Sequence, residues 1–463
     1  MLQEFRHRRP LALLLPFLVL AILVPLLIAR CGMSRASARP LGASPAWPQP
    51  TILPVPPAPA PLPPLPPITP PTPRPIARVL PPLTPPAALT VSSAPAAAAP
   101  SPLPTINLER IRLAGDRYVT QADDGGEVEL TLDPALQLRA EEVLRRSGAV
   151  HGAAVFVSIP DGRILAMTGR SLIEPQRSVA DLTLRPWAPA ASVFKVVTSA
   201  ALLDGRQVTP DRRVCYHGGA SRLMRDNLED RPRLDRRCGD LAHAVGFSTN
   251  SIIAKLAHRY LDPRTLERYA DAFGFNQGLQ RSAAFPLEVA ASPAVMPRED
   301  LEFARTAAGF WHVFLSPLHG ARLASAFANA GLMVGPRLVE RVRGTDGRIR
   351  EPPVPPPTRA ISAKVAREVG RMMLGTTRFG TARGTFARRR LPFEVAGKTG
   401  SLSRPRPYTH YNWFVGFAPA DSPRIAFGVI VGTDGRGVRA AEIAREVLRE
   451  APSRSTATLV ATK

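Results

Sequence analysis

The chain has 463 residues, of which 45% are apolar, and its 60 Lys and Arg outnumber its 37 Asp and Glu to leave a formal net charge of +23. The apolar fraction is large enough to fill a core, which excludes collagen, coiled-coil and wholly disordered proteins. The positive charge is spread along the chain without a dense Lys/Arg run, so we expect no nucleic-acid partner.

Residues 1–33 have the pattern of a membrane anchor. Basic residues at positions 6, 8 and 9 precede an uncharged apolar run over residues 11–29. As a helix this run would be about 28 Å long, close to the thickness of the hydrocarbon layer. The sequence therefore predicts a single-pass helix in the cytoplasmic (inner) membrane, with the rest of the chain in the periplasm or outside. Cleavage as a signal peptide at Ala36-Ser37-Ala38 remains the alternative.

Residues 34–105 are rich in Pro and Ala and contain no acidic residue. Such a segment cannot form a packed core or a ladder, because each Pro fixes φ and lacks a backbone donor. We expect a disordered linker here, a globular domain over residues 106–452, and a short disordered tail over residues 453–463.

Strand-like apolar runs lie near both ends of the globular part, at residues 153–159, 163–169, 393–401, 412–420 and 424–433. The first two flank Pro160-Asp161-Gly162 and predict a hairpin. Helical patterns lie between and after these runs, at residues 191–203, 241–260 and 440–450. The second helical pattern has a polar break at residues 248–251. This order predicts an α+β domain whose sheet unites the two chain ends.

Ser192 and Lys195 are a candidate nucleophile and base at the start of a predicted helix. Residues three apart share a helix face, so the two side chains can meet. A buried amine with a lowered pKa can take the serine proton, whereas an arginine cannot lose its charge. Only five of the 60 basic residues are lysines, and one of them stands where the chemistry requires an amine. A chance SxxK spacing is the simpler alternative.

Two further polar groups have the composition of a binding site. Ser248 and Asn250 interrupt an apolar helical stretch, where they could relay a proton and hold a substrate amide, or merely cap a helix. Residues 398–401 (Lys-Thr-Gly-Ser) follow a strand-like run. A cation and hydroxyls could bind a carboxylate there, and Gly400 would let a ligand approach the backbone. A strand that ends in a turn is the structural alternative.

Cys215 and Cys238 are the only cysteines of the globular part. In an exported protein such a pair favours a disulfide over a metal site, and two free thiols remain possible. The sequence contains no HExxH, GxSxG, Walker or dinucleotide-binding motif. We therefore expect neither a metal nor another cofactor.

The order SxxK, SxN and KTG is the motif set of penicillin-binding proteins and class A β-lactamases. Over roughly residues 128–450 the chain resembles the transpeptidase domain of penicillin-binding proteins. Further resemblance lies in stretches that begin at Leu130, Gly162, Phe327, Gly380 and Trp413, and in the cysteine pair before the SxN motif. The resemblance implies a five-stranded antiparallel sheet packed between helices, with the three motifs in one cleft that acts on D-alanyl-D-alanine ends of peptidoglycan stems.

The resemblance also implies roles for the motif residues. Ser192 would be the acylated nucleophile, Lys195 its base, and Ser248 the relay of the proton to the leaving amine. Five residues would bind substrate. By the same resemblance, Asn250 would hold the peptide backbone, Lys398 and Thr399 would face the terminal carboxylate, and the amide of Ser401 would complete an oxyanion hole with that of Ser192. The fifth is Gly400, beside which a ligand can approach the backbone.

Two positions depart from the family pattern. Ser401 stands where Thr is more usual, and Asn412 stands where Asp often precedes the tryptophan. Neither change removes a catalytic group.

The expected function is that of a membrane-tethered D,D-transpeptidase that crosslinks stem peptides, binds β-lactams covalently and lacks a glycosyltransferase domain. Its partners would be the stem peptides, the inner membrane, and a separate glycosyltransferase or proteins of division or elongation. A D,D-carboxypeptidase, which uses water as acceptor, has the same motifs. A catalytically inactive cell-wall scaffold or a β-lactam sensor is the non-enzymatic alternative.

Overall fold

The structure, a computed structural model, describes residues 106–405, 408–435 and 437–451. The expected membrane anchor, the Pro-rich linker and the tail from residue 453 lie outside the described residues. No helix within the described ranges is both long and apolar enough to cross a bilayer.

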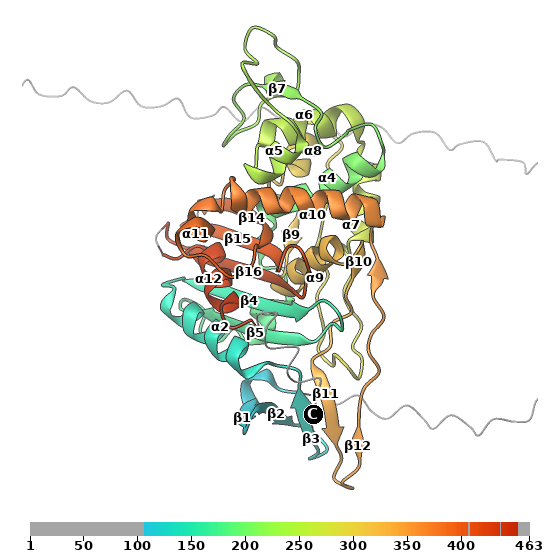
Figure 1. Cartoon of the computed structure of the whole chain (residues 1–463), viewed down its shortest axis with the longest axis vertical. Helices are drawn as coiled ribbons and strands as arrows, with labels where there is room; N and C mark the ends of the chain where they lie inside the picture. Colours follow the sequence, from blue (N-terminus) through green and yellow to red (C-terminus); the bar gives the residue numbers. More distant parts are fainter. Residues whose placement is uncertain (1–105, 406–407, 436, 452–463) are drawn as a thin grey trace, which may run out of the picture. The chain divides into compact units, whose positions relative to one another are not determined.

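A five-stranded antiparallel sheet forms the centre of the domain and contains strands from both ends of the chain (Figure 1). In spatial order its strands are β14 (Ala396–Pro405), β15 (Tyr408–Ala418), β16 (Ile425–Thr433), β4 (His151–Ser158) and β5 (Ile164–Ser171). The early strand β4 pairs with the late strand β16 along its whole length. This topology confirms the predicted α+β fold, including the early hairpin and the three late strands.

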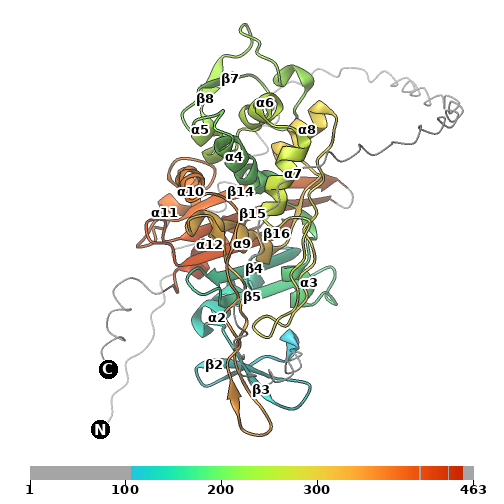
Figure 2. The same cartoon turned by 90° about the vertical axis from the view of Figure 1, so that its right-hand side faces the viewer.

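Helices cover both faces of this central sheet, as Figures 1 and 2 show. One face packs against α2 (Pro134–Arg146) and α12 (Ala440–Leu448), and the other against α9 (Pro317–Ala328). Strand β16 is therefore buried at every residue. A side chain on Gly428 would place its Cβ 2.2 Å from the Pro317 carbonyl oxygen. Glycine at this position lets α9 pack closely on the sheet.

A second sheet, which the sequence analysis did not predict, lies beside the central one. It consists of β1 (Arg112–Ala114), β2 (Arg117–Gln121), β3 (Glu127–Leu130), β11 (Val339–Arg343) and β12 (Ile349–Arg350). Its strands are short and carry many charged residues, so they lack a clear apolar period. The remaining strands of the described residues form three two-stranded sheets: β6 (Ala188–Pro189) with β9 (Phe314–Leu315), β7 (Val214–Tyr216) with β8 (Arg237–Gly239), and β10 (Leu332–Met333) with β13 (Thr358–Arg359).

The middle of the chain forms a helical lobe. Its helices are α4 (Lys195–Asp204), α5 (Leu241–Gly246), α6 (Asn250–Tyr260), α7 (Pro263–Ala272) and α8 (Asp300–Ala307). Helix α10 (Ala363–Arg378) contacts both α5 and the edge strand β14, so it joins the lobe to the sheet. The remaining short helices are η1 (Leu108–Arg110), α3 (Val179–Leu184), η2 (Ala191–Phe194), η3 (Arg225–Asn227) and α11 (Arg383–Arg388).

The structure refines two of the helices that the sequence predicts in this lobe. The predicted helix over residues 191–203 begins as the 3-10 turn η2 and becomes α-helical at Lys195. The pattern over residues 241–260 is two helices, α5 and α6, and the polar break separates them.

Candidate active site

Ser192 and Lys195 meet where η2 continues into α4. The Lys195 Nζ lies 2.7 Å from the Ser192 Oγ. The amine is fully buried, while Ser192 is half-buried and lines two cavities. The spacing of three residues therefore brings hydroxyl and amine into contact, as the sequence predicted.

Two acceptors from other parts of the chain hold the Lys195 amine in place. It donates to the Asn250 Oδ1 at 2.7 Å and to the Ala308 carbonyl oxygen at 2.5 Å. Burial, and then the positive charge of Lys398, place the pKa of Lys195 well below its usual value. Burial and the charge of Lys398 thus favour the neutral amine, while the two acceptors fix its position beside the serine hydroxyl. No residue pattern could have indicated Ala308, since it contributes only a backbone carbonyl.

Ser248 and Asn250 lie at the junction of α5 and α6. Ser248 adopts a φ of 60°, which turns the chain sharply between the helices. Asn250 is the first residue of α6. Its Nδ2 donates to the Ala220 carbonyl oxygen at 2.6 Å and to that of Gly219 at 3.3 Å. The carboxamide thus links Lys195 to the loop that follows β7.

Lys398 projects from the edge strand β14 and is fully buried. Its Nζ donates to the Ser248 Oγ and to the Thr399 carbonyl oxygen, each at 2.9 Å. Burial lowers the pKa of Lys398 to about 7. The two residues of the SxN motif therefore contact different lysines. Ser248 accepts from Lys398 of the KTG motif, and Asn250 accepts from Lys195.

The rest of the KTG segment faces the same region. The Thr399 Oγ1 lies 2.6 Å from the Oγ1 of Thr381, in the loop between α10 and α11. A Cβ on Gly400 would lie 3.1 Å from the Ala190 carbonyl oxygen, so glycine brings β14 close to the segment before Ser192. Thr381 was missed by the motif search, although it belongs to the stretch from Gly380 that resembles the family.

The two departures from the family pattern contact each other. Ser401 and Asn412 are cross-strand partners on β14 and β15, and the Asn412 Nδ2 donates to the Ser401 Oγ at 3.1 Å. The Asn412 Oδ1 accepts from the backbone N–H of Ala440 at 2.9 Å, at the start of α12. Asn412 thus ties the strand edge to a helix beside the cleft.

Two cavities meet at the nucleophile. One, of about 420 Å³, is lined by Ser192, Ser248, Thr399 and other polar residues. The second, of about 670 Å³, extends past Leu402 to the loop after α8. Ser192, Asn250 and Ser401 line both. The structure thus brings together the three motifs, which are separated by more than 50 residues in sequence.

Cys215 and Cys238 form a disulfide between β7 and β8, and a charged network lies beside it. The His217 ring contacts Asp235 at 2.6 Å and Asp226 at 2.9 Å. The buried Lys255 donates to Asp235 at 2.7 Å. Burial opposes charge on Asp235, yet hydrogen bonds from Lys255 and His217 lower its pKa to about 2. This network holds the loop whose carbonyl oxygens accept from Asn250.

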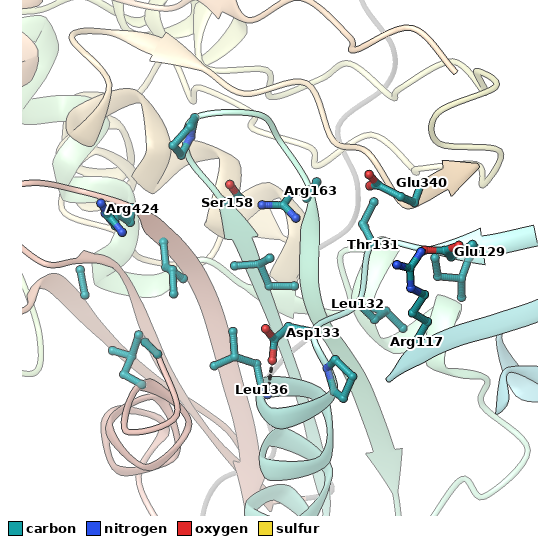
Figure 3. A pocket seen from close by; sticks show the side chains of 18 of the residues that line it. Arg117, Glu129, Thr131, Leu132, Asp133, Leu136, Ser158, Arg163, Glu340 and Arg424 are labelled. Atoms are coloured by element: carbon teal, nitrogen blue, oxygen red, sulfur yellow. Dashed lines mark hydrogen bonds and ion pairs between the residues drawn. The ribbon is translucent and has the colours of Figure 1, made fainter. Parts of the chain in front are cut away.

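A third cavity, of about 560 Å³, lies between the second sheet and the start of α2, and its lining shares no residue with the two at Ser192 (Figure 3). Arg117 pairs with Glu129 at 2.5 Å, and Arg341 pairs with the same carboxylate at 2.9 Å. Asp133 accepts the N–H of Leu136 at 3.0 Å and so caps α2. These charges are engaged within the fold, so we assign the cavity no part in the chemistry.

Within the described residues, no group of three or more His, Cys, Asp or Glu side chains could hold a metal ion. The groups that line the two cavities include serine and threonine hydroxyls and the His410 imidazole, and the two buried lysine amines contact Ser192 and Ser248 of this lining.

Comparisons with known proteins agree with this geometry. Residues 152–449 match the family model of the penicillin binding protein transpeptidase domain. Peptidoglycan D,D-transpeptidase PbpA of Mycobacterium tuberculosis is 27% identical over 391 residues, which cover 75% of this chain and 78% of PbpA. PbpB of Mycolicibacterium smegmatis is 26% identical over 338 residues, which cover 67% of this chain and 51% of PbpB.

Solved structures agree as well. The D,D-transpeptidase domain of an Eggerthella lenta peptidoglycan glycosyltransferase superposes with a TM-score of 0.59 at 26% identity and covers 71% of this chain and 83% of that one. PBPA from Mycobacterium tuberculosis superposes with a TM-score of 0.58 at 25% identity and covers the same shares. The chain therefore belongs to the penicillin-binding protein transpeptidase domain family.

Proposed function

We propose that this protein is a peptidoglycan D,D-transpeptidase that works through an acyl-enzyme on Ser192. One observation carries the assignment: a fully buried lysine amine with a lowered pKa lies 2.7 Å from a serine hydroxyl that opens into a cavity. A neutral amine in this position can act as a general base, which a surface lysine cannot do at neutral pH.

In the acylation step, the Ser192 Oγ attacks the carbonyl carbon of the penultimate D-alanine while its proton passes to the Lys195 Nζ. A tetrahedral oxyanion forms and is stabilised by backbone N–H groups, for which we assign Ser192 and Ser401. The C–N bond then breaks, the proton that Lys195 took from Ser192 passes to the nitrogen of the leaving D-alanine, and an ester remains on Ser192 beside a neutral Lys195. Ser248 relays this proton; its hydrogen bond with Lys398, at 2.9 Å, supports a position on the leaving-group side.

Substrate binding falls to the second and third motifs. Asn250 is held by the Ala220 carbonyl oxygen and can pair with the peptide backbone of the donor. Thr399 lines the smaller cavity, and the buried Lys398 lies behind its wall, where its amine contacts Ser248, a second lining residue. A hydroxyl with a cation close behind it suits the terminal carboxylate. A bound carboxylate favours the charged form of Lys398, whose pKa is about 7 in the free protein.

Deacylation completes the crosslink. The amine of a second stem peptide attacks the ester carbonyl, and Lys195 takes the amine proton and returns one to the Ser192 Oγ. A peptide bond forms as the ester breaks. Water in place of the amine would give the carboxypeptidase reaction. The complete set of hydrogen-bonded motif residues argues against an inactive scaffold or sensor.

A penicillin acylates the same serine, because its lactam amide occupies the place of the scissile bond. A fluorescent penicillin should therefore label the protein covalently, and Ser192→Ala should abolish the label. Persistent labelling of Ser192→Ala would remove the assigned nucleophile. Lipid-linked glycan strands with pentapeptide stems then separate the two acceptors: dimeric stems support the transpeptidase, and free D-alanine without dimers supports the carboxypeptidase.

We further propose that residues 11–29 anchor the enzyme in the inner membrane and that the domain works outside the cytoplasm, where stem peptides are found. The family match is to the transpeptidase domain. The protein would therefore crosslink strands that a separate glycosyltransferase polymerises, together with proteins of division or elongation.

A further inference from the structure

We propose that Trp311 determines specificity in the larger cavity, where its indole forms an apolar wall for the acyl side of the donor. This side is the peptide segment before the scissile bond, or the acyl side chain of a penicillin. The inference rests on the proposed function and names a residue that would select among donors.

Trp311 lies in the loop between α8 and β9, and it lines the cavity of about 670 Å³ together with Ser192, Phe310 and Leu402. It remains 42% exposed, although it is the bulkiest apolar residue type. No other ring or cation among the described residues stacks on its indole. A large apolar surface beside a nucleophile indicates a contact for a ligand.

The backbone at Trp311 is strained. Its φ is 41°, in the left-handed region that bulky residues avoid. Such conformations persist only where surrounding contacts impose them, and they gather at ligand sites.

The loop that carries Trp311 packs against the nucleophile segment itself. The Ala190 N–H donates to the Val313 carbonyl oxygen at 2.8 Å. At the other end of the loop, a Cβ on Gly309 would lie 2.3 Å from the Ala191 carbonyl oxygen and 3.0 Å from the Ser192 Cα. The loop is thus fixed on both sides to residues 190–192, so the indole has a set position relative to Ser192.

Charged groups near Trp311 are engaged with one another. Arg305 donates to Glu302 at 2.5 Å and to the Leu223 carbonyl oxygen at 2.6 Å, while His312 contacts the other Glu302 oxygen at 3.3 Å. These interactions pair the charges of Glu302 and Arg305, while Arg222, which also lines the cavity, forms no ion pair within the described part of the chain. What the loop offers to a ligand is the apolar surface of Phe310 and Trp311.

The placement of the two cavities decides which end of the donor meets Trp311. The smaller cavity contains Thr399 and Ser248, so it takes the terminal carboxylate and the leaving residue. The larger one extends along residues 401–403 of β14, an edge strand of the central sheet. An extended peptide can pair with such an edge, and its side chains would then lie against the facing loop.

Two penicillins test this directly. Benzylpenicillin carries an aromatic acyl side chain, and 6-aminopenicillanic acid has the same lactam and carboxylate without one. We expect Trp311→Ala to lower the second-order acylation rate with benzylpenicillin about tenfold, the effect of losing one aromatic contact. The rate with 6-aminopenicillanic acid should change less than about twofold, and Trp311→Phe should retain most of the preference.

Trp311→Gly measures the strain separately. Glycine adopts positive φ freely, so this variant should melt above Trp311→Ala while it shows the same loss with benzylpenicillin. Arg206 is a matched control because it also has a positive φ, of 57°, but lines neither cavity at Ser192. Arg206→Gly should leave both acylation rates unchanged.

The outcomes separate this inference from the proposed function. Equal changes with both penicillins, or none with benzylpenicillin, would overturn the role of Trp311 while the acylation of Ser192 stands. If the wild-type protein is acylated by neither compound, the proposed function itself fails.

Discussion

At the scale of single residues, two lysines divide the chemistry by their protonation state. Both amines are fully buried, and Lys195 also experiences the charge of Lys398. In the proposed mechanism Lys195 is the base, and Lys398 supplies the positive charge for the substrate carboxylate. Arginine, which dominates the basic residues elsewhere in the chain, could serve only the second role.

Replacement of Lys195 by arginine should therefore remove the base and retain the positive charge. We expect Lys195→Arg to slow acylation by a fluorescent penicillin on the order of 10³-fold, the usual contribution of a general base. Lys364→Arg, an exposed site on α10, is the matched control and should label at the wild-type rate. Wild-type labelling of a folded Lys195→Arg variant would contradict the assignment, with the melting temperature as the measure of folding.

The pH dependence follows from the same two groups. Below the pKa of Lys195 the base is protonated, so kcat/KM should fall as the pH decreases. Burial lowers the pKa of Lys398 to about 7. Above this pH Lys398 becomes neutral and no longer attracts the substrate carboxylate, so kcat/KM should fall again. A donor whose carboxylate is replaced by a neutral amide should lose the alkaline decrease and keep the acidic one. An unchanged alkaline decrease with that donor would show that Lys398 does not bind the carboxylate.

At the scale of elements, the segment between Cys215 and Cys238 acts as a brace for the cleft. The disulfide joins β7 to β8, and the next residues along β7 lead to Gly219 and Ala220. The carbonyl oxygens of these two residues accept from Asn250, which in turn contacts Lys195. A fixed conformation of this segment therefore helps to hold Asn250, and through it Lys195, in position.

Loss of the disulfide should affect stability and catalysis together. A cross-link between residues 23 apart should stabilise the domain by about 3 kcal/mol, since it restricts the unfolded chain. The double variant Cys215→Ser/Cys238→Ser should melt roughly 4 °C lower and acylate more slowly. Dithiothreitol should reproduce both effects in the wild type and have none on the double variant. If the reduced wild type keeps its melting temperature and rate, the brace has no such role.

At the scale of the whole molecule, the cleft lies between a helical lobe and the edge of a sheet. Ser192, Lys195, Ser248 and Asn250 come from the lobe, and residues 398–401 come from strand β14. Helix α10 contacts both parts and so keeps their spacing. All of these residues belong to the described domain, and its fold alone assembles them.

The segment before this domain should determine location and not chemistry. We expect the full chain to sediment with membranes and to resist extraction with alkaline carbonate, because residues 11–29 are long enough to cross the bilayer. A variant without residues 1–33 should be found in the soluble fraction and label with penicillin at the same rate. If expression of the full-length gene yields a soluble protein whose N-terminus has been cleaved near Ala36-Ser37-Ala38, the signal-peptide alternative is favoured.

The sequence alone determined the family, the central sheet and the motif residues. Three motifs with constrained spacing, and strand runs with continuous apolar character, are local signals that survive without coordinates. The second sheet left no such signal, because strands such as β12 have two residues and both are exposed.

Only the tertiary structure decided what these residues experience. The lowered pKa of Lys195 depends on burial by α6, α8 and β14, and no single segment encodes that exclusion of water. The same holds for Trp311: it has a positive φ in a loop that packs against residues 190–192, more than 100 positions earlier. Residue identity is local, whereas solvent exclusion and backbone strain are set by segments that meet only in the folded chain.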